Sequence, residues 1–133
     1  MVESTIQVLS TSAVSGASGS VYCWGVNRDG QLGTGEVGKK QSSKKGDDAA
    51  HSMLPVKAKG LKGVKIKSVH SFANYMVAVS SDNGQVYAWG SNSRGCLGLP
   101  SSVGEQVTLP TKVPNLIGIE TVSCGTWHVL ALS

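Results

Sequence analysis

Apolar residues recur along the chain at every second position or in short runs, and nowhere with the sustained 3.6-residue spacing of an amphipathic helix. Two apolar runs, 75–79 and 85–89, are separated by Ser-Ser-Asp-Asn-Gly. The Asn-Gly pair supplies the positive φ angles that a tight turn needs, so these runs predict a β-hairpin. The segments 64–67 and 119–122 alternate apolar and polar residues, as a strand does when one face is buried. The pattern therefore predicts short strands joined by turns.

Part of this pattern occurs twice. The segment VYCWGVNRDGQLGTG at 21–35 returns as VYAWGSNSRGCLGLP at 86–100. In the same order, VHSFANYMVAVS at 69–80 is followed later by its counterpart VSCGTWHVLALS at 122–133. An ordered recurrence of this kind indicates duplication. Repeats that each supply about one four-stranded sheet are typical of a β-propeller, so we expect an all-β fold made of propeller blades.

We divide the chain into three segments on this basis. Residues 1–20 are interpreted as an N-terminal segment that carries the last strand of a preceding repeat. The first repeat spans 21–85 and the second spans 86–133, where the pattern breaks off. The first repeat is longer because it contains a polar, lysine-rich inserted loop at 37–53.

Composition excludes several classes of protein. Of the 133 residues, 40% are apolar and 15% are charged, which fits one globular domain, or part of one, better than a disordered tail. The 17 glycines disfavour a helical bundle, and three cysteines without Cys-x-x-Cys spacing indicate neither a disulfide framework nor a zinc ribbon. No secretory signal or apolar membrane span is evident. We expect an intracellular protein of the cytoplasm or nucleus, with no contact to a membrane.

The net charge of +4 is unevenly distributed along the chain. Residues 39–67 carry a formal charge of +7, and the remaining residues carry −3. A local excess of lysine suits an acidic protein surface or the phosphates of a nucleic acid. The segment lacks the interleaved aromatic residues that single-strand binding proteins use, so we rank nucleic-acid or nucleosome contact as the less favoured alternative.

The titratable residues form no recognisable catalytic pattern. His51, His70 and His128 are isolated from one another in the sequence, and the eight carboxylates show no close pairing. The glycine-rich turns are not followed by the Lys-Ser or Lys-Thr of a phosphate-binding loop. We therefore predict no catalytic, metal or cofactor-binding site, and a protein that is not an enzyme.

The two copies of the pattern resemble a known repeat. The pattern V-Y-x-W-G-x-N-x-x-G-x-L-G, followed by V-x-C-G-x-x-H-x-x-A-L at 122–132, resembles the repeat of the regulator of chromosome condensation family, named for the chromatin-bound exchange factor of the small GTPase Ran. The resemblance covers 21–133. The first copy departs from the family pattern, with Ser-Phe at 71–72 in place of Cys-Gly and Tyr75 in place of the histidine.

The resemblance implies a seven-bladed β-propeller, of which this chain would hold about two blades. Two blades leave apolar flanks uncovered, so we expect self-association, a partner or missing chain to complete the propeller. Trp24 and Trp89 share one repeat position and are predicted to lie in the core between blades. We expect Cys124 to be buried, Cys96 to be the more exposed thiol, and His128 to be held by local hydrogen bonds in a strand.

The family resemblance also implies a function. Its members are protein-interaction platforms, so we expect a non-enzymatic protein–protein interaction module, with guanine-nucleotide exchange on a small Ras-like GTPase as the alternative. The partner would be a small GTPase or an acidic protein surface, and a homo-oligomer would complete the propeller. Partner contacts are predicted in the turns after each Trp-Gly and in the inserted loop, at Asn27, Arg28, Asp29, Lys39, Lys40, Lys44, Lys45, Asn92, Ser93 and Arg94.

Overall fold

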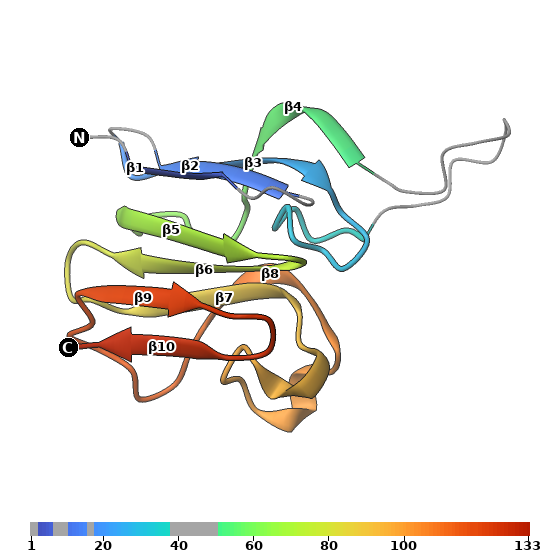
Figure 1. Ribbon diagram of the computed structural model, residues 1–133. Coiled ribbons are helices and arrows are strands. Elements are labelled where there is room, and N and C mark those ends of the chain that lie inside the picture. The colour runs from blue at the N-terminus through green and yellow to red at the C-terminus, as the bar shows by residue number, and fades with distance from the viewer. Residues whose placement is uncertain (1–2, 7–10, 16–17, 38–50) are drawn as a thin grey trace, which may run out of the picture.

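The computed structural model describes residues 3–6, 11–15, 18–37 and 51–133 (Figure 1). Its strands, in chain order, are β1 (Glu3–Ile6), β2 (Thr11–Ser15), β3 (Val21–Val26), β4 (His51–Lys57), β5 (Ile66–Phe72), β6 (Tyr75–Ser80), β7 (Val86–Ser91), β8 (Gln106–Lys112), β9 (Thr121–Cys124) and β10 (Val129–Leu132). The helical elements of the described residues are two 3-10 turns, η1 (Ser93–Gly95) and η2 (Ser101–Val103). No helix among these residues is long and apolar enough to cross a membrane.

The strands form stacked antiparallel sheets. The first blade has the order β1-β2-β3-β4 and the second has the order β5-β6-β7-β8, while β9 and β10 pair with each other. The second blade lies between the other two sheets, because β5 contacts β1 and β2 as well as β9 (Figure 1). Consecutive four-stranded meanders packed face to face are the architecture of a β-propeller, which confirms the predicted all-β fold.

Each blade draws on more than one copy of the sequence repeat. In the second blade, β5 and β6 come from the residues of the first repeat, whereas β7 and β8 come from the second. The repeat and the blade therefore have the same length but are offset by two strands. This offset links neighbouring blades through a continuous chain, since every repeat supplies the last strands of one blade and the first strands of the next.

The hairpin expected around Asn83-Gly84 is present. It joins β6 to β7, and Gly84 has a φ of +62°. Other boundaries differ from the expectation: β5 begins at Ile66 and β9 at Thr121, each two residues later than the alternating segment that predicted it. The strand β4 begins at His51, inside the predicted inserted loop, whose residues 38–50 lie outside the described part of the chain.

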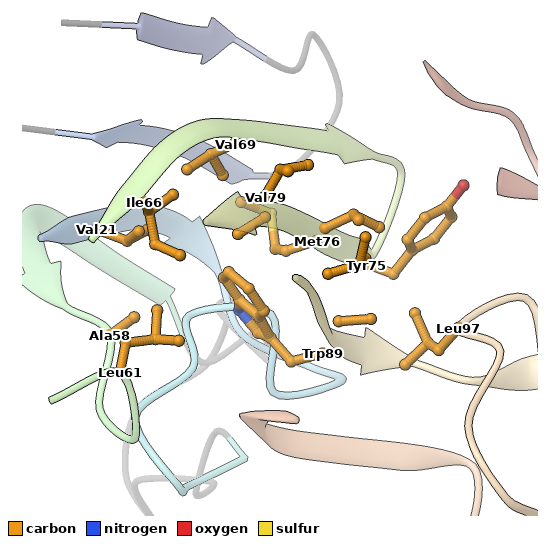
Figure 2. Close-up of a cluster of buried hydrophobic side chains, with 14 of the residues drawn as sticks. Val21, Ala58, Leu61, Ile66, Val69, Tyr75, Met76, Val79, Trp89 and Leu97 are labelled. Atoms are coloured by element: carbon orange, nitrogen blue, oxygen red, sulfur yellow. The ribbon is translucent and has the colours of Figure 1, made fainter. Parts of the chain in front are cut away.

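The indole ring of Trp89 holds the first two blades together. Its side chain is fully buried, and its Nε1 donates a hydrogen bond to the carbonyl oxygen of Gln31 at 2.9 Å, across the junction between blades. Figure 2 shows the ring among side chains of both blades, with Ala58 and Leu61 nearby. The predicted inter-blade role of Trp89 is thus confirmed. Trp24, at the same repeat position, is only half-buried.

Two expectations about the last hairpin were wrong. Cys124 is only partly buried, because β9 and β10 have no further sheet packed on them among the described residues. His128 is exposed and precedes β10 instead of lying within it. The histidine side chain therefore lies in the turn between the two strands.

Candidate functional site

The turns that follow β3 and β7 lie at one edge of the stacked sheets. The turns between β5 and β6 and between β9 and β10 lie at the same edge, on the right of Figure 1. We call this edge the rim and define it by residues 27–31, 73–74, 91–98, 104–106 and 125–128. Turns displayed on rigid strands are common binding positions, so the rim is the candidate site.

Two predicted site residues on the rim hold the turns in shape. Asn27 accepts a hydrogen bond from the backbone N–H of Leu32 and donates one from Nδ2 to the carbonyl of Glu36. Asn92, at the same repeat position, makes the same pair of bonds with Leu97 N–H and the carbonyl of Gly104. Both side chains are buried. Their side-chain amides hold the turns in shape from the inside. Contacts with a partner would therefore be made by the exposed residues beside them.

Asp29 connects the first blade to the second at the rim. Its Oδ2 accepts a hydrogen bond from Asn74 Nδ2 at 2.9 Å, and Asn74 lies in the turn between β5 and β6. Its Oδ1 accepts a longer bond from Gln106 Nε2 at 3.3 Å, and the same Nε2 also reaches the carbonyl of Arg28. The carboxylate thus joins two segments of the second blade to the first-blade turn.

Arg94 makes the equivalent connection one blade further on. The Arg94 guanidinium lies over the ring of Trp127, with its Cζ 4.8 Å from the ring centroid, a cation–π arrangement. Arg94 and Asp29 occupy the same repeat position, and so do Trp127 and Asn74. The rim therefore carries one contact per blade junction at matching positions, made by a hydrogen bond at the first and by a cation–π pair at the second.

A polar depression opens between the turns of the two repeats. It has a volume of about 460 Å³ and is lined by Asp29, Ser91, Ser93, Glu105 and Gln106. Two of its five lining residues, Asp29 and Ser93, belong to the predicted set. Arg28 and Arg94 are exposed on the same rim. Lys39, Lys40, Lys44 and Lys45 lie outside the described residues.

Several rim residues were missed by the sequence prediction. Trp127 is 58% exposed, although it belongs to an apolar segment that predicted a strand. Asn74, Glu105 and Gln106 lie outside the recurring Trp-Gly turns, so their place beside these turns follows only from the folded sheets. Aligning the two copies places Asn74 at the same repeat position as Trp127, and this equivalence could have indicated that both lie in matching turns.

Tyr75 fastens the last hairpin to the second blade just behind the rim. Its hydroxyl lies within hydrogen-bond distance of the carbonyl oxygens of Gly125, at 2.5 Å, and His128, at 3.0 Å. The ring is buried, and burial is the main cause that raises the pKa of Tyr75, which keeps the hydroxyl protonated as a donor. Tyr75 shares its repeat position with His128, so a polar ring at this position joins one blade to the next.

The three cysteines are free thiols of graded accessibility. Burial raises the pKa of Cys23 to about 12 and that of Cys124 to about 11, and it also raises the pKa of the partly exposed Cys96. Alkylation requires the thiolate, so all three thiols should react slowly near neutral pH and faster as the pH rises. We expect iodoacetamide to label Cys96 first and Cys23 last, as peptide mapping by mass spectrometry would measure. Native-state labelling of Cys23 as fast as that of Cys96 would contradict the described burial.

Metal ligands are not grouped in the described ranges. No set of three or more His, Cys, Asp or Glu side chains there is arranged to hold a metal ion. The chemistry that the rim offers consists of hydrogen-bonding groups, exposed charges and one exposed indole.

Solved structures with the same fold identify the architecture. The structure of Prp20p from Saccharomyces cerevisiae, reported with its binding properties to Gsp1p and histones, matches with a TM-score of 0.77 and 22% identity, covering 93% of this chain and 29% of that one. The crystal structure of human WBSCR16 matches with a TM-score of 0.69 and 24% identity, covering 87% of this chain and 26% of that one. At these identities the likeness establishes the fold.

Curated relatives match along most of the chain. The ultraviolet-B receptor UVR8 of Arabidopsis thaliana is 34% identical over 117 residues, covering 87% of this chain and 24% of the receptor. The probable E3 ubiquitin-protein ligase HERC6 of Homo sapiens is 36% identical over 117 residues, covering 86% of this chain and 10% of the ligase. This chain thus spans a quarter or less of these two relatives.

The family model for the regulator of chromosome condensation (RCC1) repeat matches residues 18–79 and 83–132. The two matched ranges agree with the duplicated pattern and account for most of the chain. With its stacked antiparallel blades and two matched repeats, this chain belongs to the regulator of chromosome condensation (RCC1) repeat family.

Proposed function

We propose that this chain is a non-enzymatic protein–protein interaction module that binds its partner through the rim. The observation that carries the proposal is the convergence of both Trp-Gly turns on one polar depression, lined by Asp29 of the first repeat and Ser93 of the second. Asn27 and Asn92 hold the two turns in place from inside. A partner would meet a surface that is already formed, which lowers the entropic cost of binding.

The residue types on the rim suit a protein partner. Trp and Arg are enriched among the residues that dominate binding energy at protein interfaces. Trp127 and Arg94 are exposed side by side, and Arg28 is exposed beside the depression. The carboxylates of Asp29 and Glu105 line the depression itself, so it suits a cationic or hydrogen-bonding side chain of the partner.

Binding by rim variants tests this proposal. The similar protein Prp20p was reported with binding properties to Gsp1p and histones, so purified Gsp1p and purified histones are the probes. We expect the 133-residue chain to bind at least one of them, and the double variant Arg28→Ala with Trp127→Ala to weaken that binding at least about tenfold. Surface plasmon resonance measures the dissociation constants.

The matched control truncates an apolar side chain away from the rim. Leu54 in β4 is 75% exposed, so Leu54→Ala removes exposed apolar surface without changing the turns. We expect it to bind as tightly as the unchanged chain. Binding of neither probe, or equal weakening by Leu54→Ala, would count against the rim as the partner site.

Guanine-nucleotide exchange is the second candidate function, favoured by the fold shared with Prp20p. Exchange requires the module to loosen a bound nucleotide, with no bond made or broken. The test is the release of fluorescent GDP from Gsp1p with and without the chain. Faster release that Arg28→Ala with Trp127→Ala abolishes would support exchange, whereas binding without faster release would leave the interaction module as the function.

The two-stranded sheet of β9 and β10 exposes apolar side chains that the equivalent strands of the second blade bury. Leu130 and Leu132 are 66% and 61% exposed on the two-stranded sheet, whereas their counterparts Val77 and Val79 are buried in a four-stranded one. We propose that further blades cover this sheet, supplied by a longer chain, by other copies or by a partner. Light scattering on a sizing column tests self-association, because a mass of several copies assigns the blades to other copies and a mass of 13.7 kDa leaves a longer chain or a partner as their source.

A further inference from the structure

Two partly exposed cysteines lie where the second blade meets the last hairpin. Cys96 follows the 3-10 turn η1, and its Sγ lies 3.6 Å from the carbonyl oxygen of Ser91. Cys124 is the last residue of β9 and pairs in register with Val129 of β10. Both side chains pack against the same buried core cluster. The thiols are distant in the sequence, and the fold brings the elements that carry them together.

The turn that carries Cys96 contacts the turn that follows Cys124. Arg94 is two residues before Cys96, and its Cζ lies 4.8 Å from the ring centroid of Trp127, three residues after Cys124. A backbone hydrogen bond closes each turn, at 3.0 Å in the first and at 2.8 Å in the second. Neither turn is free to extend, so this contact holds the two cysteines near each other.

Tyr75 of β6 lies between the two thiols. Its hydroxyl donates a hydrogen bond to the carbonyl oxygen of Gly125, the residue after Cys124, and its ring shares the buried cluster with Leu97, the residue after Cys96 (Figure 2). Burial is the main cause that raises the pKa of Cys124, a hydrogen bond from Tyr75 lowers it, and the charge of a Cys96 thiolate raises it. A charge shifts the pKa of a neighbouring group at short range, so the two sulfurs lie close to one tyrosine and to each other.

The two repeats differ at both cysteine positions. The first repeat has Gln31 where the second has Cys96, and it has Ser71 where the second has Cys124. A single cysteine at either place would serve as a small apolar side chain. The second repeat instead has cysteine at both places, and these two residues supply the two sulfurs that a disulfide needs.

The last hairpin can approach the second blade without losing strand pairing. Among the described strands, β9 and β10 pair only with each other, so no ladder to another sheet has to break. Both thiols are partly exposed, and a small oxidant can therefore reach them. We propose that Cys96 and Cys124 form a redox pair, and that their oxidation to a disulfide fastens the last hairpin to the second blade.

A peroxide supplies the oxidant for this step. The Cys96 thiolate attacks one oxygen of hydrogen peroxide, the O–O bond breaks, and a sulfenic acid forms while the departing hydroxide takes up a proton. The Cys124 thiolate then attacks that sulfur, the S–S bond forms, and the S–O bond breaks to release a second hydroxide, which is protonated to water. Two thiols and one hydrogen peroxide thus give one disulfide and two waters. Burial raises the pKa of both thiols, so the reaction is slow near neutral pH.

A glutathione titration tests the pairing. The 133-residue chain is equilibrated at about pH 8 with mixtures of reduced and oxidised glutathione, its remaining thiols are blocked with iodoacetamide, and its peptides are mapped by mass spectrometry. We expect one disulfide, between Cys96 and Cys124, with Cys23 left as a thiol. The equilibrium constant for its formation should be at least about tenfold larger than in urea, because the fold holds the sulfurs together. Glutathione adducts alone, a link between two chains, no oxidation, or an equilibrium constant no larger than in urea would each overturn the proposal.

Residues taken from the other repeat provide matched variants. Cys96→Gln and Cys124→Ser each introduce the residue that the first repeat has at that position, and each should abolish the disulfide. Cys23→Ala introduces the residue at the matching position of β7, Ala88, and should change disulfide formation by no more than about twofold. A disulfide that persists within Cys96→Gln, or that is lost in Cys23→Ala, would assign the bond to Cys23 and contradict the pairing. Circular dichroism confirms that each variant folds.

Amide hydrogen exchange tests whether the bond fastens the hairpin. Exchange in β9 and β10 is compared before and after oxidation, and Cys96→Gln is treated identically as the control. We expect the oxidised chain to exchange at least about threefold more slowly in both strands, dithiothreitol to reverse the change, and the variant to show none. A disulfide that leaves exchange in the hairpin unchanged or faster would refute the proposed fastening.

Discussion

Trp89→Ala should lower the free energy of unfolding by about 3–5 kcal/mol, the usual range for removing a buried aromatic side chain. The indole is fully buried between the first two blades, so its loss leaves a cavity at their junction and an unpaired carbonyl on Gln31. Because domains are stable by about 5–15 kcal/mol, most of the folded population would be lost under mild denaturant. Urea unfolding followed by circular dichroism measures the change.

The duplicated sequence provides its own control for this substitution. Trp24 has the same neighbours in the sequence pattern but is only half-buried, so Trp24→Ala should cost clearly less than Trp89→Ala. The difference between the two variants reports the contribution of the described blade junction. Equal losses for both would show that the tryptophan stabilises each blade internally and not the junction.

Gly90→Ala should destabilise the second blade by about 2–6 kcal/mol, since it combines backbone strain with overpacking. Gly90 has a φ of +99°, and an added Cβ would lie 2.6 Å from the carbonyl oxygen of Asn74 and 2.7 Å from the Cα of Tyr75. These atoms belong to the first residue of the neighbouring strand β6 and to the residue before it, whose backbone has little freedom to move. The same urea titration measures the loss.

Gly95→Ala separates the two causes. Gly95 also has a positive φ, at +68°, but no atom lies within 4 Å of an added Cβ. This variant should cost only the strain, about 1–2 kcal/mol. If Gly90→Ala were no more destabilising than Gly95→Ala, the close approach of β6 and β7 at Gly90 would be contradicted.

Much of the fold could be predicted because its signals are local or repeated. The Asn-Gly turn fixes the β6–β7 hairpin, and the recurrence of Val-Tyr-x-Trp-Gly identifies β3 and β7 as equivalent strands. Because β3 and β7 are equivalent, the turns that follow them lie at the same end of their blades. The offset between repeat and blade was not predicted, because a period gives the length of a unit without its starting point.

The rest of the candidate site depends on contacts between distant residues. The sequence predicts that Asn27 and Asn92 are equivalent, but only the fold shows that their amides bond to their own turns. The pairing of Asp29 with Asn74 joins residues 45 positions apart. Trp127 lies in an apolar stretch that predicted a strand and yet is exposed, because it falls in the turn between β9 and β10.

Amide hydrogen exchange with and without a bound protein probe tests the rim most directly. The chain is compared alone and saturated with Gsp1p or histones, whichever binds. We expect slower exchange at residues 27–31, 92–98 and 125–128, with no change at 57–65 or in the turn at 81–84. Protection confined to 57–65 and 81–84, with the rim unchanged, would contradict the central claim that partners bind at the rim.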